Sequence, residues 1–240
     1  MVREPAAVLR RPAIALAALG LFDLLAPYGP DLGTWAQVVL LGVVSLPLAT
    51  VVVRELLPWR ESGTRLLGGA AAAAAVAAAC ILLGFPGTPA MLAKLVAATL
   101  IGYALATLIG SPVEVVAIAL LIAAVDIYSV AAGPTEVIVE EHENVLNALT
   151  LAFHPVGSDG AAQIGVSDFI FFAVFLAAAA GLRLRVALTW TAMTASFGLT
   201  LALSYGFDTA LPALPLLSLG FLAANADVLL RRRRGIAGSP

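Results

Sequence analysis

Two aspartates stand inside long apolar stretches of this sequence. Asp126 lies within residues 117–132 (AIALLIAAVDIYSVAA), and Asp168 lies within residues 164–180 (IGVSDFIFFAVFLAAAA). A carboxylate at membrane depth costs about 2.5 kcal/mol or more, so an acid placed there is a candidate functional residue. Two carboxyl groups held close together share one proton, because both cannot ionise easily. The ionised group can then activate a water molecule while the protonated group polarises a peptide carbonyl. The pair therefore predicts an aspartyl hydrolase that works inside the bilayer.

The composition predicts an all-α, polytopic membrane helix bundle of about eight transmembrane helices. Apolar residues make up 61% of the 240-residue chain and charged residues 12%, and the mean hydropathy is +1.02. Apolar runs near 20 residues long recur, which is the length that a helix needs to cross the hydrocarbon core. The predicted spans are 12–26, 34–53, 66–84, 90–110, 112–132, 163–181, 186–204 and 210–230.

Basic residues orient this bundle. Of the 13 Lys and Arg residues, all but Lys94 fall on one side of the eight spans, and the positive-inside rule assigns that side to the cytoplasm. They are Arg3, Arg10, Arg11, Arg54, Arg60, Arg65, Arg183, Arg185 and Arg231–Arg234. Both termini are then cytoplasmic. Loop 133–162, which carries acidic residues and no Lys or Arg, is predicted to be exoplasmic.

The two aspartates are predicted to lie at the same depth. Span five runs outward and carries Asp126 about six residues before its end, whereas span six returns inward and carries Asp168 about five residues after its start. At 1.5 Å of rise per residue, both carboxyl groups lie roughly 8–9 Å below the outer boundary. Matching depths on consecutive spans are what a shared site requires.

Two local features at the same outer end add to this prediction. Gly165, three residues before Asp168, permits close backbone approach and loosens the start of its helix. The segment 211–215 (LPALP) begins the last span with two prolines, which remove backbone donors and make the helix start irregular. Irregular backbone at membrane depth is tolerated where it is buried in protein or lines a cavity.

These elements, in this order, resemble the intramembrane aspartyl proteases of the presenilin and signal peptide peptidase group, archaeal and bacterial members in particular. The first motif of that family matches Asp126-Ile127-Tyr128-Ser129-Val130, the second (Gly-x-Gly-Asp) matches Gly165-Val166-Ser167-Asp168, and the third is Pro212-Ala213-Leu214. The resemblance covers roughly residues 113–230. It implies catalysis by Asp126 and Asp168 without a cofactor or metal. It implies substrate contacts from Tyr128, Gly165, Ser167, Pro212, Ala213 and Leu214.

The resemblance also implies substrates, location and organisation. The substrates would be transmembrane proteins or signal-peptide-like segments, cleaved in a prokaryotic plasma membrane. Residues 1–110 would form a scaffold, and residues 111–240 would carry the catalytic helices. Two motif positions depart from the family, since Val125 replaces a usual Tyr and Ser167 replaces the second Gly. The chain also has one span fewer than the usual nine. The exoplasmic loop 133–162 corresponds to the signal peptide peptidase branch.

Other functions remain open at this stage. Buried aspartates also serve proton-coupled transporters, a catalytically inactive relative would keep the same motifs, and prepilin peptidase-like enzymes use two aspartates as well. His142 and His154 form no compact metal-ligand pattern, so a solvated acidic loop is the preferred interpretation there. Asp23, at the end of span one, is interpreted as hydrated. The charge distribution argues against nucleic-acid binding. The runs 137–139 and 146–153 could form a short strand or a re-entrant segment, and an unwound substrate could pair with such a strand edge.

Overall fold

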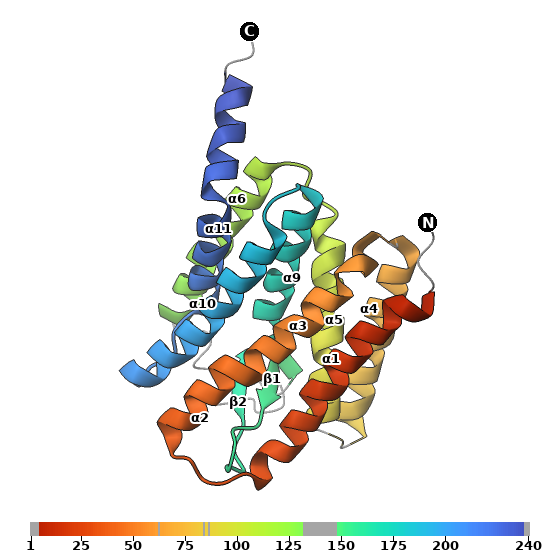
Figure 1. The fold of residues 1–240 in the computed structure, drawn as a ribbon, viewed down its shortest axis with the longest axis vertical. Helices are drawn as coiled ribbons and strands as arrows, with labels where there is room; N and C mark the ends of the chain where they lie inside the picture. Colours follow the sequence, from red (N-terminus) through yellow and green to blue (C-terminus); the bar gives the residue numbers. More distant parts are fainter. Residues whose placement is uncertain (1–4, 62, 84, 86, 132–147, 238–240) are drawn as a thin grey trace.

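The chain folds into a bundle of helices with one small sheet in the computed structural model, which describes residues 5–61, 63–83, 85, 87–131 and 148–237 (Figure 1). The helices are α1 (Pro5–Leu25), α2 (Thr34–Leu40), α3 (Leu46–Leu56), α4 (Gly63–Leu82), α5 (Thr88–Ala106), α6 (Pro112–Ala131), α9 (Val166–Gly181), α10 (Val186–Phe207) and α11 (Ala213–Ala237). A π-helical turn, Leu41–Ser45, joins α2 to α3. Two 3-10 turns cover Ala26–Tyr28 and Leu57–Glu61.

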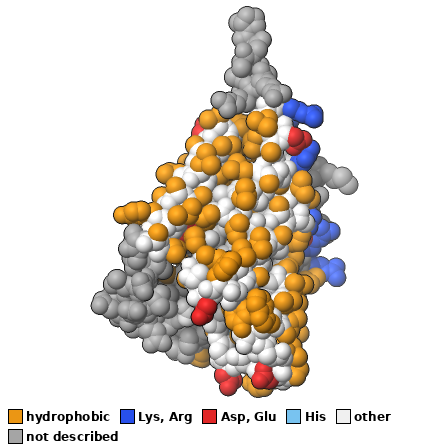
Figure 2. Space-filling model, turned by 90° about the vertical axis from the view of Figure 1, so that its left-hand side faces the viewer, with side chains coloured by type: hydrophobic (Ala, Val, Ile, Leu, Met, Phe, Trp, Pro, Cys, Tyr) orange, Lys and Arg blue, Asp and Glu red, His pale blue; other side chains and the backbone are white. Residues whose placement is uncertain are grey.

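Six helical segments of the described chain are long and apolar enough to cross a membrane. They are Arg10–Tyr28, Thr34–Glu61, Thr88–Ala106, Pro112–Ala131, Val186–Phe207 and Ala213–Arg231. Two further apolar helices are shorter, Leu66–Leu82 and Val166–Gly181. The predicted all-α membrane bundle is confirmed, with six helical segments in the described chain that are long enough to span. The protein is a multi-pass membrane protein. Figure 2 shows one face with many apolar side chains, with acidic side chains toward both its lower and its upper end and basic side chains along one edge.

The sixth predicted span, 163–181, is wrong at its beginning. Residues Ala162–Gly165 form strand β2, which pairs antiparallel with strand β1 (Thr150–Phe153), and helix α9 begins only at Val166. Ile164 and Val166 kept the apolar run continuous, so hydropathy alone could not separate the strand from the helix. The candidate strand in 146–153 is confirmed for its second half, whereas 137–139 lies outside the described residues.

Helix α9 is the centre of the hydrophobic core. Every residue from 172 to 179 is buried, which fits a helix that is apolar on all sides and surrounded by other helices. Phe172 stacks on Phe197 of α10 with ring centroids 5.6 Å apart. Phe175 stacks on Phe221 of α11 at 4.8 Å. One core cluster joins residues from both halves of the chain, so the predicted scaffold and catalytic regions pack as one unit.

Helices α5 and α9 pack closely together at Gly102. A Cβ atom at this position would lie 2.4 Å from the carbonyl oxygen of Ile170 and 2.7 Å from Cβ of Ala173. Small residues permit such approaches between membrane helices, where close packing replaces the hydrophobic effect as the source of association. Gly102 thus fixes the position of α9 against the N-terminal half of the bundle.

We predict that Gly102→Ala destabilises the protein by about 1–3 kcal/mol, because the added methyl group must displace the backbone of α9. Gly68→Ala in α4 is the matched control, since a Cβ there meets nothing within 4 Å. Thermal unfolding in detergent micelles, followed by tryptophan fluorescence, measures both. Equal midpoints for the two variants would show that α5 and α9 are not in this close contact.

Candidate functional site

The first turn of α9 carries Asp168. Gly165 ends β2 and is the N-cap of α9, so the carboxyl group of Asp168 lies beside exposed backbone N–H groups at a helix N-terminus. A Cβ atom on Gly165 would lie only 3.1 Å from Oδ2 of Asp168. A side chain at this position would crowd the carboxyl group of Asp168 by a few tenths of an ångström, whereas the backbone angles of Gly165, φ −58° and ψ 136°, are open to any residue. Asp168 is half-buried and Ser167 is exposed.

Asp126 receives a hydrogen bond from the beginning of α11. The backbone N–H of Leu214 donates to Oδ2 of Asp126 over 3.0 Å, across 88 residues of sequence. Leu214 is the second residue of α11, so its N–H has no acceptor within its own helix. A carboxylate from α6 therefore caps a helix that lies beside it. Within the part of the chain that the structure describes, no hydrogen bond occupies the other oxygen, Oδ1.

The prolines at 212 and 215 explain why Leu214 supplies this donor. Pro212 precedes the helix, where its fixed φ angle sets the direction of the chain, and Pro215 stands in the first turn without a backbone N–H. The side chain of Leu214 is buried and holds the turn in the core. Pro212 and Ala213 are half-buried beside it. The Pro-Ala-Leu segment thus presents a fixed N–H group to α6.

The structure brings the two predicted catalytic residues together. The carboxyl groups of Asp126 and Asp168 lie within electrostatic range of each other, although 42 positions separate them in the sequence. Helix α6 packs along α11, and α11 packs in turn against α9 and α10. The site is therefore assembled from α6, α9 and α11, with two carboxyl groups and one backbone donor. Such a group can bind and activate a water molecule.

Two of the other predicted site residues, Tyr128 and Ser167, have exposed side chains. Tyr128, two residues beyond Asp126, has 72% of its surface exposed and faces outward from α6. With Ser167 exposed as well, neither side chain is held in a defined position by the described protein. Contacts between substrate and Tyr128, Gly165, Ser167, Pro212, Ala213 or Leu214 remain predictions.

Sequence reasoning missed a buried polar cluster beside the sheet. Asp23 has 2% of its surface exposed and is not hydrated as predicted. Its carboxyl group accepts hydrogen bonds from the hydroxyl of Thr88 and from the backbone N–H of His154, and it contacts Nδ1 of His154 at 3.0 Å. The interpretation of His154 as part of a solvated loop is therefore wrong. His142 lies outside the described residues. The sequence does place Asp23 late in one span and His154 in a loop predicted on the same side of the membrane. Neither position, however, indicates which residue the other pairs with.

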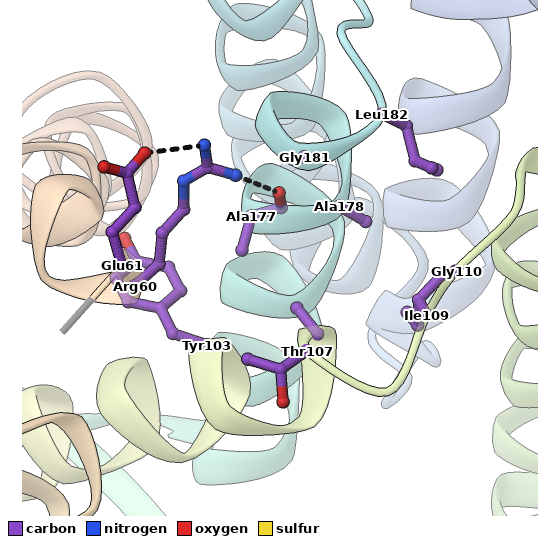
Figure 3. Close-up of a pocket in the computed structure, with 11 residues that line it drawn as sticks. Arg60, Glu61, Tyr103, Thr107, Ile109, Gly110, Ala177, Ala178, Gly181 and Leu182 are labelled. Atoms are coloured by element: carbon purple, nitrogen blue, oxygen red, sulfur yellow. Dashed lines mark hydrogen bonds and ion pairs between the residues drawn. The ribbon is translucent and has the colours of Figure 1, made fainter. Parts of the chain in front are cut away.

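A cavity of about 340 Å³ lies at the opposite end of α9 (Figure 3). Arg60 reaches across it, donating from Nη1 to the carbonyl oxygen of Ala177 at 3.3 Å and pairing with Glu61 at 3.1 Å. Ala177 is nine residues beyond Asp168, which corresponds to roughly 13 Å along the helix. This cavity is therefore separate from the aspartates. Within the described part of the chain, no three His, Cys, Asp or Glu residues cluster as a metal site would require.

No protein-family model and no curated protein sequence matches the chain. The site and the bundle define a multi-pass membrane protein in which two acids from separate helices meet a helix N-terminus.

We predict that the effects of replacing Asp126 and Asp168 on the free energy of unfolding are not additive. Asp126→Asn and Asp168→Asn should each stabilise the protein, because each removes the same repulsion from a partly desolvated pair. The double variant should gain less than the sum of the single gains, by about 0.5–3 kcal/mol. Thermal or denaturant unfolding in micelles measures the stability of the parent protein, the two single variants and the double variant.

A control cycle pairs Asp168→Asn with Glu114→Gln. Glu114 lies on α6 twelve residues before Asp126, roughly 18 Å away along the helix, and its side chain is exposed. These two changes should be additive. If the Asp126 and Asp168 changes were equally additive, the carboxyl groups would not interact.

Proposed function

We propose that this protein is an intramembrane aspartyl protease that cleaves transmembrane or signal-peptide-like segments. The observation that carries the proposal is the meeting of three groups from separate helices: the carboxyl groups of Asp126 and Asp168, and the backbone N–H of Leu214. Each belongs to one of the three motifs for which the sequence resembles that family. Chance packing of apolar spans gives no reason for all three to gather at one end of the bundle.

In the proposed reaction, one carboxylate accepts a proton from a water molecule as the oxygen attacks the carbonyl carbon of the peptide bond. The protonated partner donates a hydrogen bond to the carbonyl oxygen, on which negative charge develops. The amine then leaves with a proton from the acid. Leu214 holds Oδ2 of Asp126, so the remaining oxygen faces the water in a fixed orientation.

Strand β2 offers the proposed substrate a place to bind in extended form. One edge of β2 pairs with β1, and no other strand among the described residues pairs with its second edge. β2 leads directly into α9, so its last residue, Gly165, is three positions from Asp168. A peptide must unwind before a bond can be hydrolysed, and an unpaired strand edge stabilises the unwound form by backbone hydrogen bonds.

The first test is cleavage of a transmembrane peptide by the purified protein in liposomes. We expect Asp126→Asn and Asp168→Asn each to lower kcat by at least about 100-fold, because each removes a general acid or base. Asp208→Asn is the matched control. Asp208 is an exposed carboxyl group just after α10, in a left-handed backbone conformation that Asn also adopts, and its loss should leave kcat unchanged.

Cleavage that survives in either variant would contradict the dyad. Absence of cleavage by the unaltered protein, together with binding of a transition-state inhibitor of aspartyl proteases, would identify an inactive relative. Absence of both would favour a transporter role for the aspartates.

The proposed topology makes a separate prediction. Both termini are cytoplasmic and the hairpin between β1 and β2 is exoplasmic, because the basic residues gather on the other side. Cys80 is the only native thiol, so single cysteines can be placed at Ser158 and Thr64 in a Cys80→Ala background. An impermeant thiol reagent added to intact cells should label position 158 and miss position 64. The reverse pattern would place the aspartates at the cytoplasmic end, as in presenilins.

A further inference from the structure

Strand β1 is fixed at both ends by polar groups of the N-terminal helices. At its beginning, Nζ of Lys94 on α5 donates to the carbonyl oxygen of Thr150 over 2.6 Å. Just beyond its end, the backbone N–H of His154 donates to Oδ1 of Asp23 on α1 over 2.9 Å. Lys94 is the one basic residue that departs from the charge pattern of the spans, and this contact gives it a role.

The turn between β1 and β2 is held by the 3-10 turn that follows α1 and by α2. The backbone N–H of Gly157 donates to the carbonyl oxygen of Ala26 at 2.8 Å, and Nε2 of Gln37 donates to the carbonyl oxygen of Val156 at 3.2 Å. Thr88 completes the arrangement by donating to Oδ2 of Asp23 at 2.5 Å, which orients that carboxyl group. The hairpin is therefore attached to α1 and α5, not only to the helix that it precedes.

These attachments are placed where they set the position of β2. β1 pairs with β2 in a single register, Thr150 opposite Gly165 and Phe153 opposite Ala162. Lys94 and Asp23 contact the chain at or next to the two outermost pairs of that register. Because charged donors and acceptors make the strongest hydrogen bonds, the ends of β1 resist displacement more than ordinary loop contacts would.

We propose that Asp23, Thr88 and Lys94 are positioning residues that hold the β1–β2 hairpin beside the two aspartates, and so determine which bond of a paired substrate reaches them. None of the three reaches the reacting atoms. A shift of β2 by one residue would present the neighbouring peptide bond, with its side chains on opposite faces. This inference rests on the proposed function, but the position of the hairpin can be measured without it.

The first measurement is the distance between β2 and α6. Spin labels at Gln163 and Leu120, both exposed, are introduced in the Cys80→Ala background, and the distribution of distances between them is recorded by pulsed electron resonance. We expect one narrow distribution in the parent protein and a broad or shifted one in Thr88→Val and Lys94→Met.

Thr99→Val is the matched control. Thr99 is buried on α5 like Thr88, but its hydroxyl donates only to Leu95 of its own helix, so the distribution should stay narrow. An unchanged distribution in both Thr88→Val and Lys94→Met would overturn the proposal.

The second measurement is the pattern of products from a transmembrane peptide, read by mass spectrometry. Loss of a hydrogen bond to a charged group should raise the ratio of products from neighbouring bonds by about tenfold to a hundredfold. A displaced hairpin with an unchanged product pattern would also overturn the proposal, since the contacts would then be structural only. If the parent protein cleaves nothing, the proposed protease function fails. The distance measurement then decides by itself whether these residues hold the hairpin.

Discussion

The backbone N–H groups at the start of a helix need acceptors, and lipid provides none. Much of this structure follows from how that requirement is met at the end of the bundle that carries the two aspartates. Helix α11 begins after Pro212, and the N–H of Leu214 finds its acceptor on Asp126 of α6. Asp168 lies in the first turn of its own helix. Each carboxyl group therefore lies beside the N-terminus of a helix, whose backbone N–H groups stabilise a partly buried acid.

The two helices that carry the aspartates are packed to different degrees. Helix α9 is enclosed by α5, α10 and α11, and the close approach at Gly102 leaves it little room to slide. α6 is held differently, because its main neighbour is α11 and much of its surface is exposed, including Leu120, Leu121 and Val125. One aspartate thus stands on the best-packed helix of the bundle and the other on a sparsely packed one. For the proposed protease, the boundary along α6 is where a substrate would enter, because α6 packs mainly against one helix, α11.

Hydropathy was sufficient to predict the helices, because a span must be apolar along its whole length. The identity of Asp126, Asp168 and Leu214 as one site was also accessible, since acids in apolar runs and a proline-flanked helix start each carry a physical signal. The strand before α9 was not, because Ile164 and Val166 are as apolar as the helix that follows. Asp23 and His154 illustrate a second limit. Each residue type can be solvated or paired, and only the folded chain decides which, by bringing together groups that are 131 positions apart.

The order of the three contributing helices along the chain has a consequence for biosynthesis. The ribosome completes α6 and α9 before it makes α11, so both acids enter the membrane ahead of the N–H group that orients one of them. Until Leu214 arrives, Asp126 lacks its partner and α9 lacks the ring of Phe221 against which Phe175 stacks. The nascent chain therefore carries its acids through the insertion machinery in an unassembled state.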